Sequence, residues 1–363
     1  MAGWRDLGNI WSILTEIDIR EIAEEAQGPI VLAFVGAVGV GKSTLIAALR
    51  HGSRTREKVI SPTIEADLDA AGRLGAADLV VLVLDATRGE FSAEEELFAD
   101  WLKAARNVLA FYNKMDAVVD ASTIKATMTV WGGARVALGS ANDPDSLAAE
   151  FAPCVLDALP DQHIALARRY PLFRSAVASK VINDTSLANA AYSLGTALPE
   201  VVPVVNIPFA VADIGILTKN QAIMAYKIGL AYAASTRWQH HVAKLGGVIG
   251  AGFLWRMIAR ELVAFIPGGW GIVPKVAVAY AGTYLVGEVV VQWYQTGEKL
   301  SPRAMRELFA EALARGKKIA QDLLARVPQP SLRRSEFVCP NPKCEKKNPK
   351  GAKFCAYCAT PLS

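Results

Sequence analysis

Residues 30–49 read IVLAFVGAVGVGKSTLIAAL, and this stretch decides the fold of the chain around it. Six apolar residues, 30–35, predict a short buried strand, and residues 36–43 then match G-x-x-x-x-G-K-[ST] without a mismatch. Glycines let such a loop turn its backbone N–H groups toward an oxyanion, and the following helix adds the positive end of its dipole. The stretch therefore predicts a phosphate-binding loop.

Two side chains of this loop have expected roles of their own. Lys42 can reach the β- and γ-phosphates of a nucleotide, and the Ser43 hydroxyl is a hard oxygen ligand of the kind that Mg²⁺ accepts. The residues expected to surround the phosphates are Gly36, Val38, Gly39, Val40, Gly41, Lys42, Ser43 and Thr44.

Strands and helices alternate after the loop. Apolar runs at 79–84, 107–112 and 135–139 predict strands, with helices between them and a closing helix over 147–159. Another helix is expected over 122–131. This alternation predicts an α/β domain with a mostly parallel sheet and helices on both faces, over residues 29–158.

The sequence N-K-M-D at residues 113–116 indicates which base is bound. The Asp116 carboxylate can accept two hydrogen bonds from the N1–H and 2-amino groups of guanine, and adenine offers no such pair of donors. We expect Asn113 to tie the neighbouring loops together and the Lys114 stem to lie across the base. Ser140 and Ala141, after the next strand, complete the predicted site for GTP or GDP.

These motifs resemble a translation-factor-class GTPase of the Era/TrmE-like branch, over about residues 29–158. The loop at 36–43 matches the family's first motif, residues 113–116 the fourth and residues 140–141 the fifth. The resemblance implies hydrolysis of GTP to GDP and a switch-loop threonine, for which Thr63 has a suitable spacing.

The sequence departs from this family at the third motif, D-x-x-G. Asp69 begins the sequence D-A-A-G, but no apolar strand precedes it, whereas Asp85 ends the strand at 79–84. Asp85 is a candidate for holding Mg²⁺ through water. Because the usual second switch is missing, we expect GTP hydrolysis that is slow or needs a partner. The catalytic candidates are Thr63, Asp69 and Asp85.

Composition frames the rest of the chain. Hydrophobic residues make up 52% of the 363 residues and the mean hydropathy is positive, which excludes a disordered chain. The first residues lack an apolar run behind basic ones, so we expect no signal peptide and a cytoplasmic nucleotide domain. The net charge of +4 is concentrated in the tail, since residues 333–353 hold seven Lys or Arg against two Glu.

Residues 1–28 predict an amphipathic helix before the phosphate loop.

The region after residue 158 is helical and strongly apolar, and residues 159–326 predict an all-α domain. Charged residues interrupt the apolar runs, so two interpretations stay open: a packed helical domain, or one that docks on or inserts into a membrane. The expected helices cover residues 164–182, 186–198, 201–217, 222–234, 242–265, 275–293 and 301–326.

Part of this region resembles the YcjF-type domain of unknown function. The resemblance rests on residues 206–221 and 247–253 and extends over about residues 171–294. It implies a helical, membrane-associated partner of the GTPase and no catalytic residues.

Four cysteines end the chain in the spacing of a metal site. Cys339 and Cys344 form one pair and Cys355 and Cys358 another, which suits one structural, tetrahedral Zn²⁺. Two disulfides or free thiols are the alternatives. Residues 337–363 resemble a short zinc ribbon, which residues 327–336 join to the helical domain as a linker. Cys154 is expected to belong to a core.

The sequence as a whole predicts a cytoplasmic GTP-binding switch protein that couples nucleotide state to the helical domain. Its basic tail fits nucleic acid, anionic lipid or an acidic protein, and equally a solvated surface. Two other functions stay open: a non-hydrolysing GTP-binding module, and an RNA- or ribosome-associated factor recruited through the zinc ribbon.

Overall fold

The computed structural model divides the chain into two compact units, Met1–Ala320 and Gln321–Ser363. The predicted helices at 122–130 and 242–265, most of the N-terminal helix and the linker at 327–336 lie outside the described residues. The structure describes residues 17–51, 62–69, 74–75, 77–118, 131, 134–195, 211–241, 272–326, 337–348, 354–355, 357–358 and 360–362.

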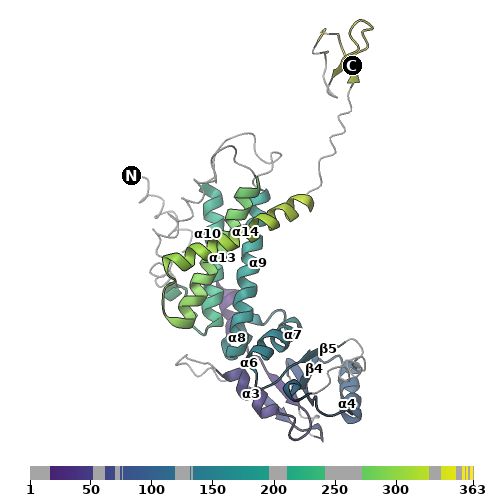
Figure 1. Cartoon of the computed structure of the whole chain (residues 1–363), viewed down its shortest axis with the longest axis vertical. Helices are drawn as coiled ribbons and strands as arrows, with labels where there is room; N and C mark the ends of the chain where they lie inside the picture. The colour runs from purple at the N-terminus through teal and green to yellow at the C-terminus, as the bar shows by residue number, and fades with distance from the viewer. Residues whose placement is uncertain are drawn as a thin grey trace. The chain divides into compact units, whose positions relative to one another are not determined.

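A five-stranded parallel sheet organises the first part of the larger unit (Figure 1). Its strands, in the spatial order β2-β1-β3-β4-β5, are β2 (Thr63–Ala66), β1 (Leu32–Val35), β3 (Leu79–Asp85), β4 (Val108–Asn113) and β5 (Arg135–Leu138). The predicted parallel sheet is confirmed. Strand β2 was not predicted, because its four residues are only partly buried and read as T-I-E-A rather than as an apolar run.

Both faces of the sheet are covered, as predicted. Successive side chains of a strand point to opposite faces, so Phe34 and Phe111 belong to one buried cluster and Leu82 and Tyr112 to another. The first cluster includes Leu45 of α3, and the second includes helix α4. The helices of this part are α3 (Lys42–Arg50), α4 (Ser92–Lys103), the π-helical turn η4 (Leu147–Phe151) and α7 (Ala152–Ala158).

Long helices make up the rest of the larger unit. Figure 1 shows α9, α10 and α13 running alongside one another, with α14 crossing them. Their shared core confirms the predicted all-α region. The helices are α2 (Arg20–Gln27), α8 (His163–Arg169), α9 (Arg174–Gly195), α10 (Val211–Ala231), α13 (Ile272–Thr296) and α14 (Pro302–Arg326).

The helix boundaries differ from the prediction at two places. The two helices expected over 201–217 and 222–234 are a single helix, α10, between Val211 and Ala231. The helix expected over 164–182 is two helices, α8 and α9, separated by the 3₁₀ turn η5 (Pro171–Phe173). Proline lacks a backbone N–H and restricts the residue before it, so Tyr170 is extended and the helix stops there. Helix α9 then continues without a break through most of the next predicted helix, 186–198.

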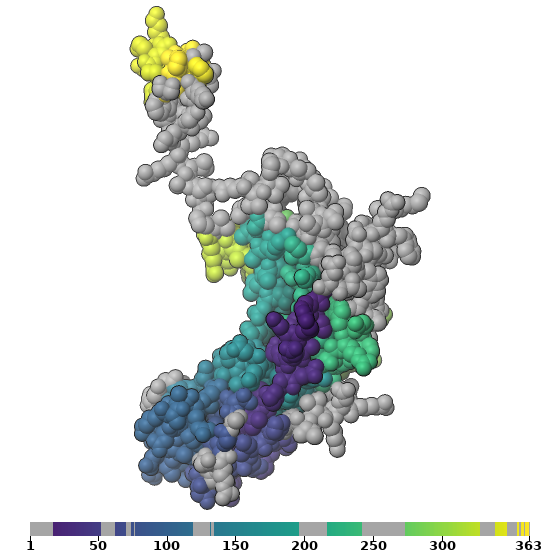
Figure 2. All heavy atoms as spheres, turned by 180° about the vertical axis from the view of Figure 1, so that it is seen from behind, coloured from purple at the N-terminus to yellow at the C-terminus, as the bar shows by residue number. Residues whose placement is uncertain are grey.

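The start of the helical region is part of the core of the sheet. Tyr170, Phe173 and Val177 are buried in the same cluster as Phe34 and Phe111. Helix α2 packs against α8 and α10. In Figure 2, α2 is part of the dark purple segment, which lies against the green segment that contains α10. The sheet and the helical region are therefore joined by continuous packing.

One helix of the described chain, Val273–Thr296 within α13, is long and apolar enough to cross a membrane by length and composition. Of its most apolar window, 72% is buried against other parts of the protein. A core helix of a soluble domain passes the same test, so the sequence alternatives of packing and membrane insertion both stay open.

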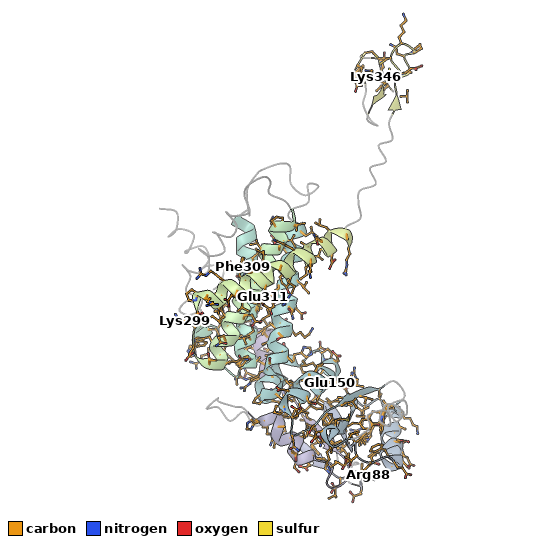
Figure 3. The ribbon with its side chains drawn as sticks, viewed as in Figure 1. Arg88, Glu150, Lys299, Phe309, Glu311 and Lys346 are labelled. Carbon is orange, nitrogen blue, oxygen red and sulfur yellow. The ribbon has the colours of Figure 1, made fainter. Side chains whose placement is uncertain are left out.

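The smaller unit carries the C-terminal ribbon. Strands β6 (Phe337–Val338) and β7 (Lys347–Asn348) pair antiparallel, and Phe354 forms a bridge with Pro361. Cys339, Cys355 and Leu362 form its small buried cluster. Figure 3 labels Lys346, which lies in this unit.

Gly316 marks the closest approach of α14 to α13, and we expect Gly316→Leu to destabilise the bundle. A Cβ atom at this position would lie 2.8 Å from the Ala277 carbonyl oxygen, so a larger side chain must push the two helices apart. Overpacking of this kind costs about 1–3 kcal/mol. The measurement is the urea midpoint of the far-ultraviolet circular dichroism signal, which should fall.

Ala314→Leu is the matched control, because Ala314 is exposed on the same helix. Its midpoint should stay within about 0.5 kcal/mol of the wild-type value. Equal effects of the two substitutions would contradict the close packing of α14 on α13.

Candidate functional site

The predicted nucleotide motifs meet at the carboxyl edge of the sheet. The phosphate loop follows β1, Asp85 ends β3, Asn113 ends β4, and Ser140 and Ala141 follow β5. Because all four strands run parallel, the segments that leave them lie along one edge.

Two glycines of the loop are required by the space around them. A Cβ atom on Gly36 would lie 2.3 Å from the Val83 carbonyl oxygen, and one on Gly41 would lie 2.3 Å from Asn113 Nδ2. Gly41 also has a φ angle of 97°, which other residues rarely adopt. The loop therefore packs directly on β3 and on the side chain that ends β4.

Asn113 joins the phosphate loop to the loop after β5. Its Nδ2 donates to the Val40 carbonyl oxygen at 2.8 Å, and its Oδ1 accepts from the Ala141 N–H at 2.7 Å. The side chain is only 2% exposed, so an unmet polar atom there would be costly. These two bonds confirm the expectation that Asn113 ties the loops together.

Lys114 reaches the phosphate loop from the next position. Its Nζ donates to the Gly39 carbonyl oxygen at 2.9 Å and forms an ion pair with Asp85 at 2.6 Å. Burial acts to raise the pKa of Asp85, but hydrogen bonds from Lys114 and Thr87 outweigh it and hold that pKa below its ordinary value.

The position of Asp85 does not suit the magnesium role predicted for it. Its carboxylate is bound to Lys114 and to the Thr87 hydroxyl, whereas the carboxylate in contact with Ser43 is Glu65. Asp85 therefore lies with Lys114 rather than with Ser43.

Strand β2 brings two carboxylates to the phosphate loop. Glu65 Oε1 accepts from the Ser43 hydroxyl at 2.6 Å, and Asp67 forms an ion pair with Lys42 Nζ at 2.8 Å. Lys42 also donates to the carbonyl oxygens of Gly36 and Ala37 and is 6% exposed. A hydroxyl and two carboxylates are hard oxygen donors, so this donor set fits Mg²⁺.

The structure separates Thr63 from the phosphate loop. Thr63 pairs with Leu32 at the start of β2, and its hydroxyl accepts from Arg50 at the far end of α3. It thus lies at the wrong end of the strand for the predicted switch threonine. Asp69 follows closely after β2, which is not an apolar run, and its side chain is exposed.

Asp116, the carboxylate expected to recognise the base, is exposed. Asp116 lies in the short 3₁₀ turn Met115–Ala117 and is exposed, and no hydrogen bond joins its carboxylate to another residue that the structure describes. Ser140 is buried, with 4% of its surface exposed, and the next residue, Ala141, donates its N–H to Asn113 Oδ1. This arrangement leaves the Asp116 oxygens available to a ligand.

Glu65 and Asp67 are the site residues that sequence reasoning missed. They stand at alternate positions of T-I-E-A-D, and alternation is the signal of one strand face. A four-residue strand with two polar positions was too short to detect by hydrophobicity alone.

The four C-terminal cysteines form the second candidate site. Their sulfur atoms lie within 4.8 Å of one another, with Cys339–Cys358 at 3.6 Å and Cys344–Cys355 at 3.7 Å. Sulfurs bound tetrahedrally to zinc at about 2.3 Å are about 3.8 Å apart, so the cluster fits one Zn²⁺. Separations of this size exclude disulfides in this structure, and Cys154 is half-buried on α7.

Comparisons with known proteins give three findings. No protein-family model matches the sequence. Magnetosome membrane protein 22 of Magnetospirillum gryphiswaldense is 31% identical over 163 residues, which are 42% of this chain and 77% of that protein. The G domain of the T. maritima FeoB iron transporter is 18% identical, with a TM-score of 0.23, over 31% of this chain and 88% of that domain.

Replacing Cys355 by Ser should remove zinc from the full-length protein. A site with three thiolates is no longer closed, so we expect the bound zinc to fall from about one equivalent to a small fraction of that after dialysis. Atomic absorption of the purified protein measures this.

Cys154→Ser serves as the control, since Cys154 contacts the Val136 carbonyl oxygen on the sheet and should not affect zinc. Full zinc content in Cys355→Ser, or the same loss in both variants, would exclude the four-thiolate site.

Proposed function

The chain belongs to the family of magnetosome membrane protein 22, and we propose that it is a GTP-binding switch protein that passes its nucleotide state to the helical region. The observation that carries this proposal is the junction at Asn113, whose two hydrogen bonds hold the phosphate loop and the loop after β5 in one frame. Such a frame fixes the distance between a phosphate site and a base site.

Guanine selectivity is assigned to Asp116. Its exposed carboxylate stands beside this frame, and a guanine would supply the N1–H and 2-amino donors that it needs. Adenine would leave the carboxylate without these partners, which polar sites discriminate against strongly. Lys114, held by Asp85 and Gly39, would line the same pocket.

Hydrolysis is proposed to be slow or dependent on a partner. Phosphoryl transfer needs positive charge at the γ-phosphate and a positioned water. The described side chains that contact Lys42 and Ser43 are the carboxylates Asp67 and Glu65, which add negative charge there. A partner that contributes a cation would supply what these residues do not.

A route from the nucleotide to the helices supports the switch. Strand β2 holds Glu65 near its carboxyl end, while just before its other end the Pro62 carbonyl oxygen accepts from the Tyr170 hydroxyl at 3.4 Å. Burial raises the pKa of Tyr170 to about 12, so this hydroxyl remains a donor near neutral pH. Tyr170 and Val177 of α9 share the core of the sheet, so a shift of β2 would reach the helices.

The helical region is proposed to associate with a membrane while the nucleotide domain stays in the cytoplasm. The apolar helix Val273–Thr296 and the relative described as a magnetosome membrane protein support this association. The zinc ribbon would add a recruiting surface for protein or nucleic acid, on which Tyr357 is 65% exposed with Lys346 Nζ 4.7 Å from its ring centre.

Calorimetry with Mg²⁺ should find tight binding of GTP and GDP and no binding of ATP to the purified chain. In Asp116→Asn, GTP affinity should fall at least about 100-fold, because an amide N–H then faces the 2-amino group. Xanthosine triphosphate should bind this variant better than the wild type, since xanthine has a carbonyl where guanine has that amino group. Equal binding of ATP and GTP by the wild type would refute the proposal.

The switch itself predicts different protease digestion of the GTP-analogue and GDP complexes. Tyr170→Phe keeps the buried ring but removes the bond to Pro62, and we expect it to reduce the difference in digestion rate at least about twofold. The control is Tyr226→Phe, which also removes a hydroxyl bond, to the Thr236 carbonyl oxygen within the helical region. If both nucleotides give one pattern in the wild type, GTP is a structural ligand and the chain is no switch.

A further inference from the structure

We propose that Glu65 is a ligand of the magnesium ion that accompanies GTP, next to the Ser43 hydroxyl. This inference rests on the proposed GTP binding and assigns to a strand residue the position that sequence analysis expected a switch-loop threonine to fill. It makes β2 the element of the fold that responds to the bound cation.

The separation of the two oxygens is the first support. Ser43 Oγ and Glu65 Oε1 are 2.6 Å apart. Neighbouring ligands of an octahedral Mg²⁺ at 2.0–2.1 Å are about 2.9 Å apart, so the pair needs little movement to share one ion. In this structure a hydrogen bond joins Ser43 Oγ and Glu65 Oε1, and a cation bound by both oxygens would replace it.

The second support is the way the fold presents Glu65. Strand pairing with β1 sets Glu65 opposite Phe34, two residues before the phosphate loop begins at Gly36. A side chain held by a ladder of backbone hydrogen bonds is placed more accurately than one on a loop. Glu65 is exposed, so its carboxylate is accessible to a cation.

Other nearby oxygen donors fit this role less well. Asp67 is engaged by Lys42 Nζ at 2.8 Å, and Thr63 is bound to Arg50 at the other end of β2. Asp85 is bound to Lys114 at 2.6 Å. Among the described residues, Glu65 is the carboxylate in contact with the loop hydroxyl.

A consequence follows for the cation requirement. Without Mg²⁺, Glu65 and a triphosphate are like charges at close range and repel each other. With Mg²⁺, the same carboxylate binds the ion and the repulsion becomes attraction. Glu65 should therefore make GTP binding depend more steeply on Mg²⁺ than a neutral residue would.

The test compares the full-length wild type with Glu65→Gln, in which the shape is kept and the charge is lost. Fluorescent GTP is titrated at a series of Mg²⁺ concentrations and in EDTA, and Mn²⁺ bound to the GTP complex is measured by the free-ion electron paramagnetic resonance signal. The matched control is Glu96→Gln, which makes the same change at an exposed glutamate of α4.

We expect Glu65→Gln to weaken Mn²⁺ binding in the complex about 10- to 100-fold, the range found when metal-supporting groups are removed. The Mg²⁺ concentration for half-maximal GTP binding should rise similarly, while binding in EDTA should be unchanged or tighter. Glu96→Gln should change each value less than about twofold, as expected for an exposed charge that is not a ligand.

Two outcomes would overturn the inference separately from the proposed function. If the wild type binds GTP with Mg²⁺ and Glu65→Gln has the same metal affinity, Glu65 is no ligand although the nucleotide site stands. If Glu96→Gln loses as much affinity, the effect is general electrostatics. If the wild type binds no GTP, the proposed function fails and this inference with it. Circular dichroism confirms that each variant is folded.

Discussion

The buried amide of Asn113 is the interaction on which the nucleotide end of the fold depends. One side chain satisfies a carbonyl of the phosphate loop and an N–H of the loop after β5, and both partners lie in backbone that forms no ladder there. A buried polar group without partners costs about 1–3 kcal/mol, so each loop is held where the amide needs it. Gly41 follows from the same constraint, since a methyl group there would collide with Asn113 Nδ2.

The charged side chains that can move most easily relative to the Asn113 junction lie on β2 or just after it. Lys114 and Asp85 pair with each other, whereas Lys42 is bound by Asp67, which follows β2, and Ser43 is bound by Glu65 of β2. Strand β2 lies at the edge of the sheet, pairs only with β1 and is partly exposed. A strand with one ladder is easier to shift than β3 or β4, so the carboxylates beside the phosphate loop lie on or next to a strand that can move more easily than the ends of β3 and β4.

The sequence allowed most of the sheet to be predicted, because β3 and β4 are continuous apolar runs buried on both faces. The sequence did not allow β2 to be predicted, because Glu65 in this strand and Asp67 just after it contact the phosphate loop rather than the core. It also failed at Pro171, where helical periodicity continued across a residue that cannot continue a helix. The cluster of four cysteines could be predicted without the structure, because the spacing of the cysteines in the sequence was sufficient.

Helix α13 illustrates why apolar length alone does not decide between lipid and protein surroundings. Its Thr283 is fully buried, accepts from Asn189 of α9 at 2.8 Å and from Gln221 of α10 at 3.2 Å, and donates to the Ala279 carbonyl oxygen. A polar layer of this kind fixes the register of three helices in either medium, because its groups are satisfied by one another. Any membrane contact must therefore use the outer faces of the bundle and leave this layer intact.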